Sequence, residues 1–316
     1  MRIEYHRTLI ADTVRNEAFY RALKAVIVPG KTVVADIGTG TGLLGLMAAK
    51  LGAKDVFMFE TAEVAGVAAK LIKANRAKRC HLIPCHSTEF DDTLSADVIV
   101  SETLGNYALE ENIIDTIADA RTRFLKPGGH LIPEGITQYV APVISPRIND
   151  ELSAWDRAGP ELKCELDLSF AKAMSFNNAY VRTLASSELL GGIANAAAWD
   201  LVDLTRDNRS ARKGSSRWRV RDARTIYGLA VWWSADLGHG IKLSTAPDGP
   251  RTHWEQLYMP LLTAVHLKAG DTVEAAIKSR SSQDAGTHLA WTVTHLDGKS
   301  RVIAKHAHDL DKGYLP

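Results

Sequence analysis

The segment 33–43 leaves few folds open to this chain, because a short apolar run there ends at Asp36 and Ile37 and leads into glycines at positions 38, 40 and 42. A glycine-rich turn between a strand and a helix lets the backbone approach a ligand closely. Such a turn follows the first strand of an open parallel sheet. We therefore expect the chain to begin with an α/β domain that binds a ligand at this turn.

The residues on both sides of this turn alternate between strand-like and helix-like segments as far as Pro133. Apolar runs predict strands at 32–37, 55–59, 81–84, 97–101 and 130–132. Helical composition, or apolar residues at helical spacing, predicts helices at 43–51, 62–75 and 109–124. The alternation is typical of a doubly wound, Rossmann-like sheet, which we assign to residues 1–134.

The pattern changes after Pro133, where short β-rich segments recur at 138–143, 218–220, 225–233, 261–266, 272–277 and 288–295. Glycine-containing turns separate several of them, which predicts an antiparallel β-barrel or sandwich over residues 135–316. Helical patches at about 147–190 interrupt this domain. They form either a projecting arm or a long connection.

The spacing of the glycines narrows the choice of ligand. A dinucleotide-binding turn would need a glycine at position 43, and Leu43 stands there, so a nicotinamide oxidoreductase is excluded. The GxGxG spacing after an acid suits S-adenosylmethionine, which has no pyrophosphate to place at a helix N-terminus. Glu60 closes the second strand, where its carboxylate accepts hydrogen bonds from ribose hydroxyls or simply faces solvent. The cofactor-binding residues predicted here are Asp36, Gly38, Gly40, Gly42 and Glu60.

Two glutamates, Glu102 and Glu111, flank a loop that follows the fourth predicted strand and contains Gly105. Ligands of an open α/β sheet bind at the carboxyl ends of its strands, where this loop lies. Two carboxylates brought together repel each other unless a cation lies between them, and a guanidinium matches carboxylates with paired N–H donors. Each glutamate alone is equally explained as a loop acid or as an acid in the first turn of a helix. The pair predicts a guanidinium site.

Bulk composition excludes several other classes of protein. The formal net charge is +1, so the whole molecule exerts no strong pull on nucleic acid, and we expect no nucleic-acid partner. No apolar run is long enough to cross a bilayer and no secretory signal opens the chain. The three cysteines (Cys80, Cys85 and Cys164) form no CxxC pair, which predicts free thiols, no metal site and a cytoplasmic location.

A basic stretch runs through residues 206–224 and contains Arg206, Arg209, Arg212, Lys213, Arg217, Arg219, Arg221 and Arg224. Charged and apolar residues alternate at 217–221, which predicts a strand with one solvated face. The functional interpretation of this stretch is a docking surface for an acidic partner. A strand with one solvated face and such a docking surface are compatible.

Three separated motifs resemble the protein arginine methyltransferase family. The segment from Ser101 to Glu111 is similar to its double-glutamate loop, Thr252-His253-Trp254 matches its Thr-His-Trp loop, and Asp12-Thr13-Val14-Arg15 resembles its cofactor-contacting segment. The resemblance covers nearly the whole chain. It implies an S-adenosylmethionine-dependent enzyme that methylates the guanidino group of arginine, most often in proteins.

The same resemblance implies roles for further residues. Arg15 would pair with the carboxylate of the cofactor, Asp12 would hold His253 as a proton acceptor, and Trp254 would join His253 at the substrate. Thr88 stands where an adenine-contacting glutamate is expected, followed by Glu89. Related enzymes form head-to-tail dimers through an arm, so the resemblance also implies a homodimer built with the segment at about 147–190.

The chain departs from the family pattern in several places. The usual N-terminal helix that closes over the cofactor is expected to be missing, with only Tyr5 near its place. Leu9 and Ile113 replace methionines, and Thr103 replaces the tryptophan after the first glutamate. These differences bear on how the substrate is enclosed and on how many methyl groups are added.

Two rival functions remain. The first keeps the chemistry but takes free arginine or another small guanidino metabolite as the substrate. The second is a non-catalytic, cofactor-binding regulatory protein, although such a protein has no need of paired glutamates. A methyltransferase for bases or glutamine would carry an Asn/Asp-Pro-Pro-aromatic string after the fourth strand, and Ser101-Glu102-Thr103-Leu104 does not match it.

Overall fold

Five parallel strands form the first sheet, in the order β3-β2-β1-β4-β5. They are β1 (Val33–Ile37), β2 (Asp55–Phe59), β3 (Cys80–Ile83), β4 (Ala96–Ser101) and β5 (Leu125–Ile132). The strand order reverses between β1 and β4, and ligands of such sheets bind where the carboxyl ends of these strands diverge. The computed structural model describes residues 3–161, 166–282, 284 and 286–313.

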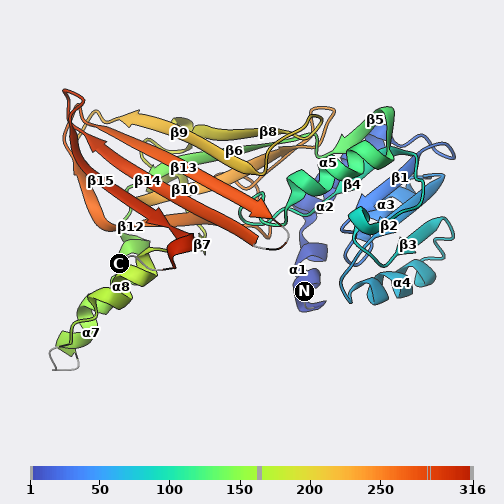
Figure 1. Ribbon diagram of the computed structural model, residues 1–316, viewed down its shortest axis with the longest axis horizontal. Coiled ribbons are helices and arrows are strands. Elements are labelled where there is room, and N and C mark those ends of the chain that lie inside the picture. Colours follow the sequence, from blue (N-terminus) through green and yellow to red (C-terminus); the bar gives the residue numbers. More distant parts are fainter. Residues whose placement is uncertain (1–2, 162–165, 283, 285, 314–316) are drawn as a thin grey trace.

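The helices of this half are α1 (Ile3–Ala11), α2 (Thr13–Val26), α3 (Leu43–Lys50), α4 (Ala65–Ala74) and α5 (Ile113–Phe124). Asp12 separates the first two helices and caps α2, because its side chain accepts a hydrogen bond from the Arg15 backbone N–H. A helix that the sequence did not predict, α1, precedes the Asp12-to-Arg15 segment and lies beside the ends of the parallel strands (Figure 1).

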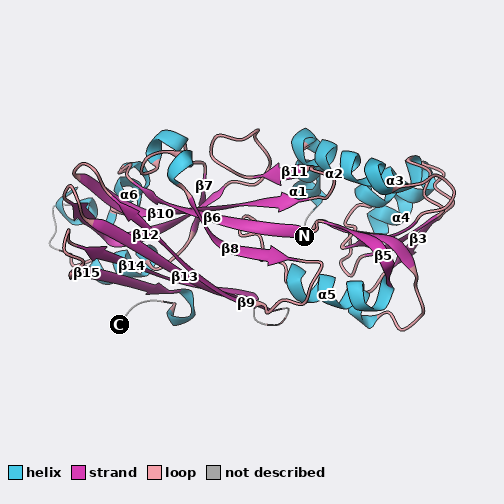
Figure 2. Ribbon diagram, turned by 90° about the horizontal axis from the view of Figure 1, so that it is seen from above, coloured by secondary structure: helices cyan, strands magenta, loops and turns pink. Residues whose placement is uncertain are grey.

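Two antiparallel sheets build the other half of the molecule. One has the order β7-β12-β10-β6-β8 with β11 beside β10, and the other has the order β15-β14-β13-β9. Their bounds are β6 (Gly135–Val143), β7 (Tyr180–Arg182), β8 (Ala197–Asp203), β9 (Ala211–Arg219), β10 (Arg224–Asp236), β11 (Lys242–Ser244), β12 (Gln256–Leu267), β13 (Thr272–Ser282), β14 (Gly286–Leu296) and β15 (Val302–Asp309). Figure 2 shows this β-barrel-like half extending away from the α/β half.

Buried aromatic side chains fill the antiparallel half, among them Trp233, Tyr258 and Trp291. Alternation of buried and exposed positions along β9 and β13 orients one face of their sheet inward. The parallel sheet ends at Ile132 and the first antiparallel strand begins at Gly135. The change of sheet therefore falls where the sequence pattern changed.

The helical segment expected at about 147–190 contains α6 (Arg147–Leu152), α7 (Trp155–Glu161) and α8 (Ser169–Phe176), followed by β7. Helices α7 and α8 project from the barrel as an arm (Figure 1). The arm exposes large apolar side chains, including Trp155, Leu166, Phe170 and Met174. Isolated apolar side chains on a surface are ordinary, but a projecting element that exposes several is typical of an interaction site.

The structure adds to the predicted elements and shifts some of them. It contains β7, β8, β11 and β15, which the sequence did not predict, and α5 begins at Ile113 because residues 109–112 belong to the preceding loop. Cys80 and Cys85 are free thiols, and Cys164 lies outside the described residues. Among the described helices, none is long and apolar enough to span a membrane.

Candidate active site

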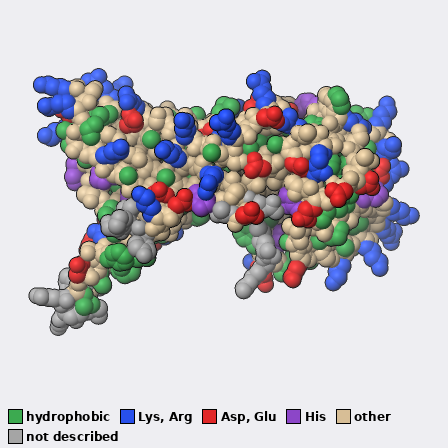
Figure 3. Space-filling model, in the orientation of Figure 1, with side chains coloured by type: hydrophobic (Ala, Val, Ile, Leu, Met, Phe, Trp, Pro, Cys, Tyr) green, Lys and Arg blue, Asp and Glu red, His purple; other side chains and the backbone are tan. Residues whose placement is uncertain are grey.

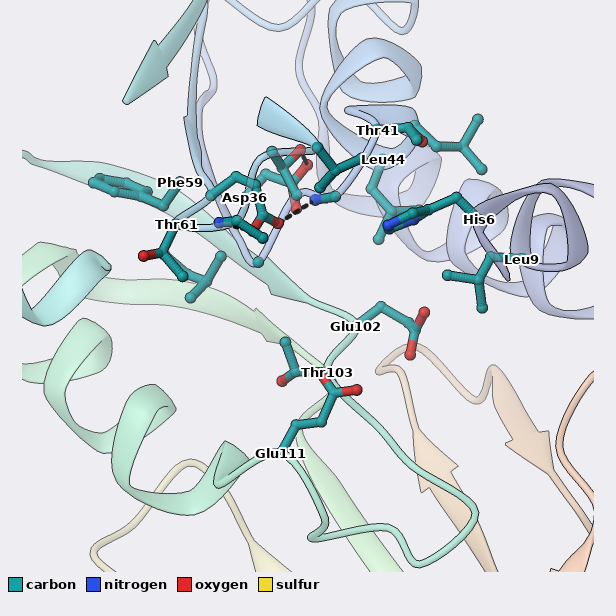
Figure 4. A pocket seen from close by; sticks show the side chains of 18 of the residues that line it. His6, Leu9, Asp36, Thr41, Leu44, Phe59, Thr61, Glu102, Thr103 and Glu111 are labelled. Atoms are coloured by element: carbon teal, nitrogen blue, oxygen red, sulfur yellow. Dashed lines mark hydrogen bonds between the residues drawn. The ribbon is translucent and has the colours of Figure 1, made fainter. Parts of the chain in front are cut away.

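A cavity of about 330 Å³ opens where β1, β2 and β4 end, and helix α1 borders it (Figure 4). The glycine turn, the end of β2, the turn after β3, the double-glutamate loop and α1 all contribute to its wall. The lining includes Tyr5, His6, Leu9, Arg15, Asp36, Gly38, Thr39, Gly40, Thr41, Glu60, Cys85, His86, Ser87, Glu102, Thr103, Glu111 and His253.

Asp36 holds the glycine turn in place. Its carboxylate accepts hydrogen bonds from the Thr39 hydroxyl, at 2.5 Å, and from the Gly45 backbone N–H, at 2.8 Å. Burial raises the pKa of Asp36 to about 6, and these two hydrogen bonds oppose the shift. The side chain thus ties the turn to α3 directly below the cavity.

Two glycines of the turn are required by close neighbours. Gly38 has φ of 71°, and a Cβ there would lie 2.6 Å from the Thr103 side chain. Gly42 also has a positive φ and is the N-cap residue of α3, but it does not line the cavity, because it packs against Met58. Of the three predicted glycines, Gly38 and Gly40 therefore line the cavity, and Gly42 packs against the core.

Glu60 lies at the end of β2, as predicted, and both of its carboxylate oxygens already accept a backbone hydrogen bond. Gly40 N–H donates to one oxygen and Ala62 N–H to the other, each at 2.8 Å. A carboxylate oxygen accepts more than one hydrogen bond, so Glu60 retains capacity for two hydroxyl donors. The backbone bonds fix the carboxylate toward the cavity.

Helix α1 contributes a buried histidine that sequence reasoning missed. His6 lines the cavity, and its Nε2 atom has no hydrogen-bond partner among the described residues. Burial lowers the pKa of His6, which keeps the imidazole neutral. The signal in the sequence was weak, because His6 lies between the apolar positions Ile3 and Leu9 of a short helix.

A second buried polar group without a partner in the described protein is the Ser87 hydroxyl, also in the cavity wall. Buried polar groups are normally hydrogen-bonded, so two such groups around one cavity indicate a polar ligand. A nucleoside supplies donors and acceptors for both. Together with Glu60 and the glycine turn, the wall fits S-adenosylmethionine.

The predicted adenine contacts lie one turn away from this wall. Thr88 and Glu89 are exposed in the short 3-10 helix η1 (Ser87–Glu89) and do not line the cavity, whereas Cys85, His86 and Ser87 do. The Thr88 hydroxyl is instead hydrogen-bonded to His86 Nδ1 at 2.7 Å. The turn brings the three preceding residues to the cavity and carries Thr88 outward.

Glu102 lies deep in the site, with 5% of its side chain exposed, and it pairs with Arg15. Arg15 Nε donates to Glu102 Oε2 at 2.6 Å, and a second donor of the same guanidinium contacts the same oxygen. Burial raises the pKa of Glu102, and the Arg15 guanidinium opposes that shift. Arg15 was expected at the cofactor. Two of its five N–H groups make no hydrogen bond within the described residues, which leaves donors for a ligand carboxylate.

Glu111 lines the same cavity but is more exposed than Glu102, at the end of the loop before α5. Partial removal from water, together with the charges of Glu102, Glu110 and Glu60, raises the pKa of Glu111 to about 7. The two glutamates therefore share one cavity, and Figure 4 shows them on the same side of it. A cation entering here relieves their repulsion.

His253 is held by Asp12, as the resemblance implied. The Asp12 carboxylate accepts hydrogen bonds from the backbone N–H and from Nδ1 of His253, both at 2.8 Å. This pairing assigns the proton to Nδ1 and leaves Nε2 as an acceptor. Burial lowers the pKa of His253, and Asp12 opposes the shift.

Trp254, predicted at the substrate, packs behind His253 instead. Its indole is buried, donates a hydrogen bond to the Leu104 carbonyl at 2.8 Å and stacks edge-on against Trp233. A buried indole needs a partner for its N–H, and the double-glutamate loop supplies one. Trp254 therefore supports the loop without lining the cavity.

The barrel half holds the double-glutamate loop at several further points. Trp233 Nε1 donates to the Gly105 carbonyl at 3.0 Å, and the Asn106 side-chain oxygen accepts from the Glu255 backbone N–H at 2.9 Å. The Tyr107 hydroxyl donates to Ser279 Oγ at 2.6 Å. Both glutamates thus sit on a loop fastened to the antiparallel strands.

A buried polar network continues from Tyr107 into the barrel. Gln138 Nε2 donates to the Tyr107 hydroxyl at 3.3 Å and to Asp200 at 3.1 Å. Arg212 pairs with the same Asp200 carboxylate, at 2.6 Å for its shortest contact. Together with the contact to Ser279, these contacts join four barrel strands to the loop, and none was visible in the sequence.

Two family models match this chain. One, described as ribosomal protein L11 methyltransferase, matches residues 19–156. The other, the arginine methyltransferase oligomerization subdomain, matches residues 136–296, just over half of the chain. The two matches cover the α/β half and the antiparallel half in turn.

Curated relatives and solved structures agree with these models. Protein arginine N-methyltransferase 6 of Danio rerio is 28% identical over 96% of this chain and 89% of the relative. Arginine N(omega)-methyltransferase of Streptomyces achromogenes subsp. streptozoticus is 31% identical over 85% of this chain and 74% of the relative. The Trypanosoma brucei PRMT1 enzyme-prozyme heterotetrameric complex with AdoHcy shares the fold, with a TM-score of 0.83, 23% identity and 96% of both chains covered.

Arabidopsis thaliana protein arginine methyltransferase 10 also shares the fold, with a TM-score of 0.81, 21% identity and 98% of both chains covered. The family match and the relatives named as arginine methyltransferases support an enzyme and not the regulatory-protein alternative. The chain belongs to the protein arginine methyltransferase family and is an enzyme that uses S-adenosylmethionine to methylate arginine.

Proposed function

We propose that the physiological acceptor is an arginine side chain in a protein, gripped by Glu102 and Glu111. The observation that carries the proposal is the shared cavity, in which one buried and one more exposed glutamate lie beside the glycine turn. An exposed second carboxylate suits a guanidinium that enters from outside at the end of a long side chain. The curated relative from Danio rerio carries the name of a protein-directed enzyme, which supports the same choice.

The bound cofactor supplies an electrophilic methyl group on a sulfonium. Glu102 and Glu111 hold the guanidinium, draw positive charge away from one terminal nitrogen and orient that nitrogen. Orientation of this kind contributes about 7 to 11 kcal/mol in favourable cases. As charge moves to the acceptor during transfer, the two fixed carboxylates stabilise it.

His253 is the proposed acceptor of the proton that the guanidine nitrogen releases. Its lowered pKa keeps the imidazole neutral near pH 7, and the hydrogen bond from Nδ1 to Asp12 directs Nε2 away from Asp12. Asp12 also stabilises the imidazolium once it forms. The proton then leaves to solvent.

Free arginine is the second candidate, favoured by the name of the Streptomyces relative, an arginine N(omega)-methyltransferase at 31% identity. Mass spectrometry of reactions that contain either free arginine or arginine-rich peptides separates the two. Methylated peptide with little methylated arginine supports the proposal. Methylated free arginine with unmodified peptides would reject it.

The arm is proposed to form a head-to-tail homodimer. Its exposed apolar side chains, among them Leu166 and Met174, and the match of residues 136–296 to an oligomerization subdomain support this. The Trypanosoma relative is a heterotetramer, so assembly occurs among proteins of this fold. We also propose a cytoplasmic location, which fractionation of the native cells would test.

A further inference from the structure

The sheet β15-β14-β13-β9 has an outer face that turns away from the barrel interior. On β9 the residues Lys213, Ser215, Arg217 and Arg219 are exposed while Ser216 and Trp218 are buried. On β13 the exposed Lys278 and Arg280 alternate with buried Ile277 and Ser279. The register places the exposed residues of both strands on one face.

This outer face collects positive charge. Five cations point outward from it, and within the described chain none forms an ion pair or hydrogen bond with a carboxylate. They are Lys213, Arg219, Lys278, Arg280 and Lys305, which together are named the basic face here. By contrast, Arg217 on the same face pairs with Glu274 across the strands.

The basic face includes a like-charge pair that the fold does not need. Lys213 lies directly opposite Lys278 in the register of β9 and β13. Like charges opposite each other in a sheet are destabilising. A lysine on an edge strand discourages edge-to-edge aggregation, which accounts for Lys213 on β9. Lys278 has no such explanation, because its strand β13 lies between β9 and β14.

One end of the basic face adjoins the double-glutamate loop. The Thr287 hydroxyl donates to the Glu110 carbonyl at 3.3 Å, and Thr287 pairs with Ser281, the residue after Arg280. From Arg280 to the level of Arg219, which pairs with Thr272, the face extends about 27 Å at the rise of a β-strand. Figure 3 shows Lys and Arg side chains spread over β9 and β13, with acidic side chains near the junction of the two halves.

We propose that the basic face binds an acidic segment of the protein substrate that is contiguous with the target arginine. The proposal rests on the proposed function, a protein acceptor. Outward residues of a strand are spaced about 6.8 Å apart, as are alternate side chains of an extended peptide, so carboxylates at alternate positions match the cations. The outward positions of β13 and β14 carry no Phe, Tyr or Trp side chain among the described residues, and single-stranded nucleic acid is bound chiefly by stacking on such side chains.

Peptides with a single arginine test this directly. Each peptide carries Glu, Gln or Lys at four alternate positions, beginning three residues from the arginine. One set of three peptides has these positions on the N-terminal side of the arginine, and a second set has them on its C-terminal side. Because several surface ion pairs add up, we expect kcat/KM for the Glu peptide of one set to exceed that for its Gln peptide by about tenfold. The preference should shrink in 0.5 M salt, since these charges are exposed.

Variants of the enzyme complete the test. The double variant K213E/K278E should lose the preference for Glu peptides while its rate on Gln peptides stays within about twofold of wild type. The matched control K70E/K73E makes the same charge change on exposed residues of α4 and should keep the preference. The neutral variant K213Q/K278Q removes the like-charge pair, so its melting temperature should equal or exceed that of wild type.

The failures are distinguishable. Equal kcat/KM for the Glu, Gln and Lys peptides of both sets would overturn the basic-face inference and leave the proposed function intact. Methylation of free arginine with no methylation of any peptide would overturn the proposed function itself. Inhibition by a single-stranded RNA oligonucleotide can be compared with inhibition by an arginine-free Glu peptide. If the RNA inhibits the wild-type enzyme better than the peptide does, and loses this advantage with K213E/K278E, the basic face binds nucleic acid and the acidic-peptide proposal is wrong.

Discussion

The two glutamates of the site lie in different surroundings, and this difference gives them different roles. Glu102 is buried against Arg15, whereas Glu111 keeps part of its side chain in water and has a pKa raised to about 7. A buried carboxylate with a fixed cation stays in one position. The more exposed one responds to the charge and the pH around it.

Glu102→Gln keeps the shape of the side chain and removes its charge. We expect turnover to fall at least a hundredfold, because a fixed charge that stabilises the transition state is worth that much in other enzymes. The dissociation constant of S-adenosylmethionine should change by less than fivefold. Steady-state kinetics with calorimetric binding measures both quantities, and turnover near wild type would rule out the glutamate pair as the guanidinium site.

The pH dependence of kcat/KM should follow the ionisation of the Glu111 carboxylate. Its pKa is raised, so the protonated form predominates below about 7 and the ionised form, which attracts the guanidinium, gains as pH rises. We expect kcat/KM to increase with a midpoint near 7 and Glu111→Gln to lose this rise. A wild-type profile that is flat between pH 6 and 8 would contradict the assignment.

At the scale of elements, α1 and the double-glutamate loop are the parts that complete the cavity. For α1 we expect His6→Ala to weaken S-adenosylmethionine binding about three- to tenfold, the range for loss of one hydrogen bond from a buried neutral group. Arg7→Ala, on the exposed side of the same helix, is the control. Equal affinities for both variants would mean that His6 makes no contact with the cofactor.

The loop depends on its attachment to the barrel, and Tyr107→Phe tests that attachment. Loss of the hydroxyl leaves the buried Ser279 hydroxyl without this donor and removes one of the two hydrogen bonds of the Gln138 side-chain N–H group, which costs about 1 to 3 kcal/mol. We expect a lower melting temperature and a lower kcat with the cofactor affinity unchanged. Tyr139→Phe is the matched control, because its hydroxyl makes no hydrogen bond within the described residues.

Local sequence patterns predicted the parallel sheet and much of the site. Apolar runs marked β1, β2 and β4 almost to the residue, since strands buried on both faces need little else. Strand β15 was not predicted, because Lys305, His306 and Asp309 give it a polar sequence. The contact between Arg15 and Glu102 joins residues 87 positions apart, and no local pattern encodes such a contact.

The resemblance placed whole motifs in the right region, but the direction of individual side chains depended on tertiary packing. Trp254 turns toward the Leu104 carbonyl, and the 3-10 turn carries Thr88 outward while Ser87 faces the cavity. Helix α1 was not predicted, because its apolar positions are scattered. These are matters of side-chain direction, which spacing along the chain does not fix.

At the scale of the whole molecule, the arm predicts an assembly. Met174→Asp on α8 puts a charge among its exposed apolar side chains, so we expect the dimer to dissociate into chains of about 34.5 kDa. Val302→Asp changes an equally apolar residue on β15 and should leave the dimer intact. Sedimentation velocity distinguishes the two, and a wild-type chain that sediments as a monomer would refute the proposed dimer.

The loop that bears Glu102 and Glu111 begins on one half of the molecule and is anchored on the other. Any hinge motion between the halves would therefore pull the two carboxylates out of alignment. A compound that binds between the two halves would therefore lower activity without occupying either the nucleoside pocket or the acceptor pocket.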